Sequence, residues 1–177
     1  MKLRRTLTVC ASALVAVAAF IPGASADVGV GAGTLDFDPA GAPAIGNFSA
    51  VTLNGTPQLT SLTVAPFTIV DATGSGAGWN VLLTVPNLVN GGDTIAASNV
   101  SMSAPVVTGA GASSLTGVSA HASAGAFASG EKMVIATATN GMGSYLVSPR
   151  LLKLTVPVTA HVGTYTSTAT IAVVSGP

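Results

Sequence analysis

Charged side chains are scarce in this sequence. Of 177 residues only 7% are Asp, Glu, Lys or Arg, and the two signs balance at six each. After position 26 just three cations remain, namely Lys132, Arg150 and Lys153. So few cations cannot build a basic patch, which argues against nucleic acid or an anionic membrane surface as a partner. Because Val, Ile, Leu and Thr are abundant, the low charge does not indicate a disordered chain.

Cysteine is nearly absent as well. The single cysteine, Cys10, lies in an apolar run at positions 7–20, behind a basic start and ahead of Ala24-Ser25-Ala26. These three parts are typical of a secretory signal peptide, and the run is shorter than the ~20 residues of a membrane span. We predict cleavage after Ala26. The mature chain, residues 27–177, would then be a secreted single domain without a disulfide or a membrane span, extracellular or associated with the cell wall.

Helix signals are nearly absent after residue 26, whereas strand signals recur between glycine, proline and asparagine. The alternation of apolar side chains predicts strands at 79–85, 152–158 and 165–173. Within 59–71 the alternation changes phase at Pro66, which indicates a bulge or a bend. Further strands are expected at 46–53, 94–102 and 131–138.

Turn signals separate the predicted strands. Asn54-Gly55, Asn90-Gly91-Gly92 and Asn140-Gly141 all tolerate positive φ. The glycine-rich run at 73–78 predicts a loop, and 109–130 predicts either a long loop or weakly patterned edge strands. Many short strands with this punctuation indicate an all-β fold, an antiparallel β-sandwich of immunoglobulin-like type.

Groups that carry out catalysis are also few. The mature chain has two histidines, His121 and His161, and no carboxylate lies close to either in sequence. We therefore expect no enzyme, no cofactor and no zinc site, since zinc needs three or four ligands. Asp36 and Asp38 have the spacing of two calcium ligands, but no further acidic ligand or fixed glycine follows, so a polar turn before Pro39 is favoured and calcium is the alternative.

Aromatic side chains make up 5% of the sequence, and Trp79 is the only tryptophan. Carbohydrate-binding proteins usually expose several aromatic rings. A lone Trp on an alternating apolar face is more typical of a core, although its indole N–H needs a partner.

Two segments together carry a resemblance to a known family. Residues 70–81 are a glycine-rich approach to Trp79-Asn80-Val81, and residues 162–173 are a Tyr-containing final strand. This arrangement resembles the WxL domain of Gram-positive surface proteins, which has two Trp-x-Leu motifs. Here Val81 stands in place of Leu, and Ile171-Ala172-Val173 stands in place of the second motif. The motif positions are Trp79, Asn80, Val81, Tyr165, Ile171 and Val173.

The resemblance implies a function in surface attachment. Family members are described as binding peptidoglycan non-covalently and as associating with partner surface proteins. No sortase-type motif follows Val174, so we expect the folded domain itself to attach. The tryptophans could form the binding surface or belong to the core, in which case Ile171 fills the same space. The alternative is a self-associating structural subunit, pilin-like or of a surface layer, because edge strands can pair between copies.

Overall fold

Antiparallel sheets dominate the computed structural model, which describes residues 28–176. The predicted signal peptide lies outside the described residues. The chain from Gly31 onward forms one compact unit, and it contains three four-stranded sheets and a hairpin. The expected all-β sandwich is therefore confirmed.

The three sheets are called sheets A, B and C. Sheet A has the order β1 (Leu35–Asp38), β3 (Phe67–Asp71), β12 (Gly143–Val147), β8 (Val107–Ala110). Sheet B has the order β10 (Ser123–Ala124), β7 (Val100–Met102), β13 (Arg150–Val156), β2 (Gln58–Val64). Sheet C has the order β14 (Thr170–Ser175), β4 (Trp79–Thr84), β11 (Glu131–Ala136), β9 (Val118–Ala120). The hairpin pairs β5 (Leu88–Asn90) with β6 (Asp93–Ile95), and two 3-10 turns, η1 (Ala97–Asn99) and η2 (Phe127–Ser129), complete the elements.

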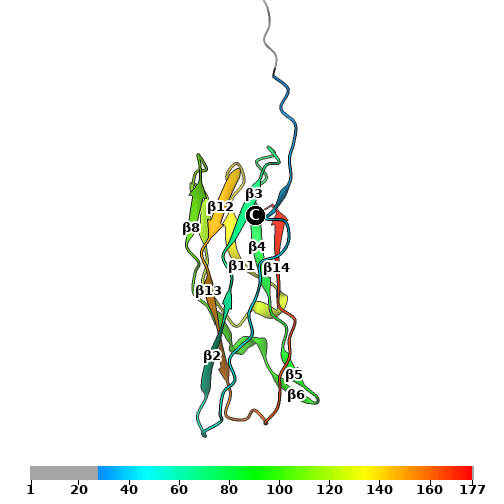
Figure 1. Ribbon diagram of the computed structural model, residues 1–177, viewed down its shortest axis with the longest axis vertical. Helices are drawn as coiled ribbons and strands as arrows, with labels where there is room; N and C mark the ends of the chain where they lie inside the picture. Colours follow the sequence, from blue (N-terminus) through cyan, green and yellow to red (C-terminus); the bar gives the residue numbers. More distant parts are fainter. Residues whose placement is uncertain (1–27, 177) are drawn as a thin grey trace, which may run out of the picture. The chain divides into compact units, whose positions relative to one another are not determined.

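Sheets A and B are two stretches of one layer, separated by a crease. Three times the chain passes directly from one sheet to the other, from β2 to β3, from β7 to β8 and from β12 to β13. Figure 1 labels both strands of the last passage, β12 and β13. Each passage contains a proline, Pro66, Pro105 or Pro149. Proline cannot donate to a sheet ladder, so three prolines at one level interrupt the hydrogen bonding of the whole layer. The phase change expected at Pro66 is thus a bend between two sheets.

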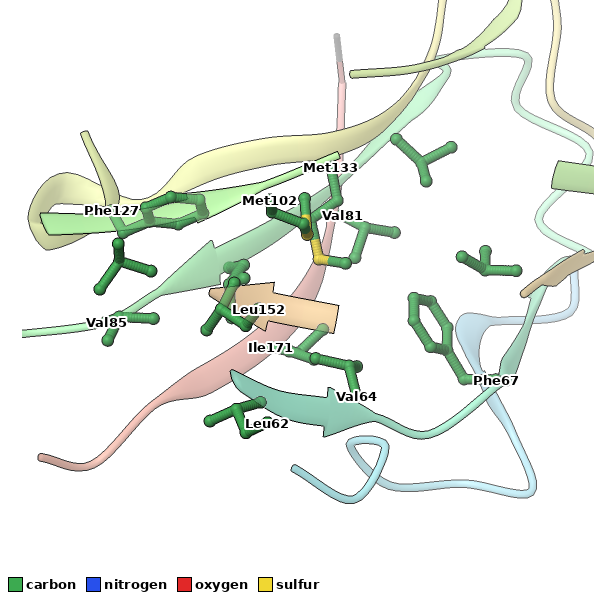
Figure 2. Close-up of a cluster of buried hydrophobic side chains, with 14 of the residues drawn as sticks. Leu62, Val64, Phe67, Val81, Val85, Met102, Phe127, Met133, Leu152 and Ile171 are labelled. Carbon is green, nitrogen blue, oxygen red and sulfur yellow. The ribbon is translucent and has the colours of Figure 1, made fainter. Parts of the chain in front are cut away.

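The core lies between this creased layer and sheet C. Figure 2 shows Val81, Met133 and Ile171 of sheet C meeting Val64 and Leu152 of sheet B. At the sheet A end, the rings of Phe37 and Phe67 meet edge to face with centroids 5.5 Å apart. Burying each large apolar side chain contributes about 1.5–3 kcal/mol, so this two-layer core is the main source of stability.

The strands predicted most clearly are present. β4 begins at Trp79, and its alternate side chains Trp79, Val81 and Leu83 are all fully buried. β13 covers the predicted 152–156 but ends at Val156, because Pro157 follows it. Val158, which we expected on the buried face, is half exposed instead.

Two predicted strands are wrong and one is displaced. Residues 46–53 form no strand but run beside the free edge of β2, where Gly46 N–H donates to Thr63 O at 2.9 Å. The predicted strand at 94–102 is split into β6, η1 and β7. The final strand begins at Thr170 rather than Tyr165, and only an isolated bridge between Thr166 and Val89 precedes it.

The small-residue segment 109–130 supplies edge strands. β8 is the last strand of sheet A, β9 the last of sheet C and β10 the last of sheet B. One stretch of chain therefore borders all three sheets, and its weak apolar pattern agrees with the burial of β8, β9 and β10, none of which contains a fully buried residue. The glycine-rich run at 73–78 contains no strand, as expected.

Candidate functional site

The two segments that carry the WxL resemblance end in neighbouring strands, 70–81 in β4 and 162–173 in β14. β4 and β14 pair antiparallel in sheet C, and Figure 1 shows β14 in red beside β4. The register places Val173 opposite Val81 and Ser175 opposite Trp79. Motif positions far apart in sequence are thus brought together in one sheet.

Trp79 is a core residue. Its side chain has no exposed surface, and its ring centroid lies 5.5 Å from that of Tyr145. Its indole N–H donates to the carbonyl oxygen of Gly141 at 2.8 Å. The polar atom of the ring is satisfied inside the protein, so Trp79 presents nothing to a ligand in this structure.

The other apolar motif positions also point inward. Val81 is fully buried, Ile171 is 4% exposed, and Val173 is half buried against the core. Ile171 pairs with Leu83 across β4 and reaches the middle of the core in Figure 2. Ile171 therefore fills a packing position with less area than a tryptophan would.

Asn80 points to the opposite face of sheet C and is nevertheless buried. Its side-chain N–H donates to the carbonyl oxygen of Gly176, just beyond β14. Its Oδ1 is enclosed and has no hydrogen-bond partner among the described residues. The amide of Asn80 thus fastens the end of β14 to β4.

The hydroxyl of Tyr165 forms its hydrogen bonds away from the other motif positions. Its hydroxyl accepts from the backbone N–H of His161 at 3.1 Å and contacts the carbonyl oxygen of His161 at 3.2 Å. These bonds close a local loop before β14, so Tyr165 has a structural role there.

Sequence reasoning missed two residues at this site: Tyr145, whose ring packs against Trp79, and Asp71, whose charge acts on Tyr145. The Tyr145 hydroxyl lies 2.9 Å from Ser114 O and 3.0 Å from Met142 O. Burial, and secondarily the charge of Asp71, raise the pKa of Tyr145. Asp71 is itself buried, and its Oδ1 accepts from the N–H and the hydroxyl of Thr73. The Asp71-Ala72-Thr73 sequence is a common Asx-turn pattern, and this pattern could have indicated that the Asp71 carboxylate bonds to Thr73.

The histidines lie in two separate, exposed pairs. His161 Nδ1 is 2.7 Å from Asp93 Oδ1, with 74% and 39% of the two side chains exposed. His121 Nε2 is 3.1 Å from Ser119 Oγ. Among the described residues no hydroxyl bonds to the His161 ring and no carboxylate bonds to His121, so neither pair is extended into a triad.

Asp36 and Asp38 lie on one exposed side of β1, around the buried Phe37. They therefore belong to a strand, and the bend falls at 39–41. Asp36 Oδ1 accepts from the N–H of Phe37 at 2.7 Å. Within residues 28–176, no group of three His, Cys, Asp or Glu side chains is placed to hold a metal ion.

No protein-family model, curated protein or solved structure matches this chain. In the part of the chain that the structure covers, none of the helices has the length and apolar character needed to cross a bilayer.

Proposed function

We propose that this chain is a secreted, non-catalytic protein of WxL type that attaches non-covalently to peptidoglycan or to a partner surface protein. One observation carries the proposal: the two segments that resemble the family's motifs are hydrogen-bonded neighbours, β4 and β14. A resemblance limited to sequence would not require the two segments to meet. The immunoglobulin-like relationship stays a prediction.

Attachment has to come from outward-facing groups. Trp79, Val81 and Ile171 are enclosed, so their contribution is to hold β4 and β14 together. The described surface carries few charges and many Thr and Ser side chains, along with glycine backbone. Such a surface suits contact with a hydroxyl-rich polymer, because neutral hydroxyls replace water without the desolvation cost of charges.

A sedimentation assay tests the proposal. The mature chain, residues 27–177, is mixed with purified peptidoglycan and with whole cell walls, and the pelleted fraction is measured at rising protein concentration. We expect saturable pelleting, which the heat-unfolded chain should not show. Protein that stays in the supernatant with peptidoglycan, whole walls and intact cells alike would refute wall attachment.

A second candidate function, self-assembly, is favoured by the edges of the sheets. The edge strands β8, β9 and β10 come from a segment, 107–130, that contains no charged residue and no proline. Charges and prolines are the usual protection against edge pairing. If copies pair through these edges, the sedimentation coefficient should rise with concentration, and Thr108→Lys in β8 should abolish the rise. A monomer at all concentrations would remove this candidate.

A further inference from the structure

A shallow hollow lies at the crease between sheets A and B. Its volume is about 390 Å³, and it is lined by Thr63, Ser103, Pro149, Arg150, Leu151 and Lys153. Lys153, Leu151 and Thr63 point away from the core on β13 and β2, whereas Arg150 stands at the start of β13, next to Pro149. The hollow is thus on the outside of the creased layer.

Positive charge is concentrated in this hollow. The described residues contain three Lys or Arg side chains, and two of them, Arg150 and Lys153, line it. No acidic side chain lines it, and in residues 28–176 neither cation forms an ion pair with a carboxylate. In a chain that is acidic after position 26, two uncompensated cations in one hollow make a local site for an anion.

Arg150 has an unmet hydrogen-bonding requirement. Its Nε is buried and has no partner among the described residues. A buried donor without an acceptor is unfavourable, and guanidinium groups bind carboxylate and phosphate oxygens with strong charge-assisted hydrogen bonds. The enclosed Nε itself lies out of reach of a ligand, so an oxyanion in the hollow would be bound by the rest of the Arg150 guanidinium together with the ammonium of Lys153.

The remaining lining groups indicate what carries the anion. Pro149 is exposed, and the Leu151 side chain is 48% exposed, so the hollow also offers apolar surface. Thr63 and Ser103 add hydroxyls that can donate or accept. Apolar surface, hydroxyls and cations together match the C–H face, the hydroxyls and the acidic group of a charged sugar.

We infer that this hollow binds an acidic sugar unit, a sugar carrying a carboxylate or a phosphate, through Arg150 and Lys153. The inference deepens the proposed function by naming the ligand class, and it rests on that function for the source of the sugar. The carboxylate of a muramic acid unit and a sugar phosphate of a wall polymer share this chemistry, so the test separates them.

Amide chemical shifts of the mature chain test the inference. N-acetylmuramic acid, N-acetylglucosamine 1-phosphate and neutral N-acetylglucosamine are titrated in turn. We expect one or both acidic sugars to shift the amides of Thr63, Ser103 and Leu151 saturably, and the neutral sugar to bind at least about tenfold more weakly. The acidic sugar that binds more tightly identifies the source.

Matched variants distinguish binding at the hollow from a general effect of the protein's positive charge. Lys153→Gln, an exposed position, and Arg150→Gln should each weaken acidic-sugar binding about tenfold, with thermal unfolding confirming that both variants fold. Lys132→Gln removes the third cation, on β11 of sheet C, and should leave binding unchanged. Equal loss with Lys132→Gln, unchanged binding in Lys153→Gln, or no shift with either acidic sugar would overturn the inference.

Failure of this site and failure of wall attachment give different results. If the wild type and the doubly substituted Arg150→Gln, Lys153→Gln protein pellet equally with walls, attachment holds and the site is refuted. If acidic sugars bind at the hollow but no wall preparation pellets the protein, the site holds and the proposed attachment is refuted.

Discussion

The indole N–H of Trp79 donates to the carbonyl oxygen of Gly141 at 2.8 Å, across a sequence separation of 62 residues. This bond joins the start of β4 to the loop that leads into β12, and therefore joins sheet C to sheet A. The tryptophan that the sequence singles out as a binding candidate thus connects the two layers of the sandwich.

Removing the indole should destabilise the fold strongly. Trp79→Ala leaves a large cavity and an unpaired Gly141 carbonyl, so we expect a loss of about 3–5 kcal/mol in the free energy of unfolding. Trp79→Phe keeps most of the packing and loses the hydrogen bond, and should cost about 1–3 kcal/mol. Urea unfolding measures both. Equal stability of Trp79→Ala and wild type would contradict the core position.

Any side chain at position 141 should lower the free energy of unfolding. The φ of Gly141 is +81°, and an added Cβ would lie 2.7 Å from Trp79 Nε1 and 2.4 Å from the Ala136 Cβ. Gly55 is a matched control, since its φ is +83° and its surroundings are open. We expect Gly55→Ala to cost about 1–2 kcal/mol from backbone strain alone, and Gly141→Ala clearly more. Similar losses in the two variants would show that the contact with Trp79 is unimportant.

A tryptophan at position 171, where the WxL motif would have one, should be unfavourable in this chain. Ile171 is 4% exposed in a filled core, so Ile171→Trp is expected to cost about 1–3 kcal/mol by overpacking. Ala172→Trp, at the next and exposed position of β14, is the control and should change stability little. If Ile171→Trp raises the melting temperature, the core has room that the structure does not show.

Alkaline pH should destabilise the protein through Tyr145. Burial raises its pKa above the usual 10.0, and Asp71 adds to this. Below pH 10 the tyrosine is protonated in both the folded and the unfolded chain, so its contribution is constant. Above pH 10 the unfolded chain loses this proton first, and the free energy of unfolding falls as pH rises.

The control for this effect is Tyr145→Phe. It should be less stable at neutral pH, because Ser114 and Met142 lose their shared hydroxyl partner, yet its stability should fall less steeply between pH 10 and 11. Urea unfolding across this range measures both slopes. Parallel slopes in the two proteins would assign the alkaline loss to other groups.

The elements predicted correctly are those whose own side chains decide their structure. Trp79, Val81 and Leu83 alternate on a strand buried on one face, and this pattern needs no knowledge of its neighbours. The failures depend on tertiary context. Val51 and Leu53 are spaced like residues on one face of a strand, yet their segment packs beside β2 without forming a ladder.

The candidate site could be predicted only in part. The sequence allowed two interpretations of Trp79, a core residue or part of a binding surface. The hydrogen bond from its indole N–H to Gly141 was needed to choose the core. The hollow at Arg150 and Lys153 leaves no local signal in the sequence, because Thr63 reaches it from β2 and Ser103 from just after β7. The pairing of β13 with β2 and β7 brings these groups together, since Leu151 lies opposite Thr63 and Leu152 lies opposite Met102, next to Ser103.

The central claim is that the family-like motif builds the core while the outer surface binds. Because Trp79 is the only tryptophan, its fluorescence tests this claim directly. Emission and iodide quenching of the mature chain are recorded with and without solubilised peptidoglycan fragments. We predict blue-shifted emission that resists iodide, is unchanged by the fragments and shifts to the red only on unfolding in urea. Red-shifted emission that iodide quenches readily in the folded protein, and that the fragments protect, would contradict the account.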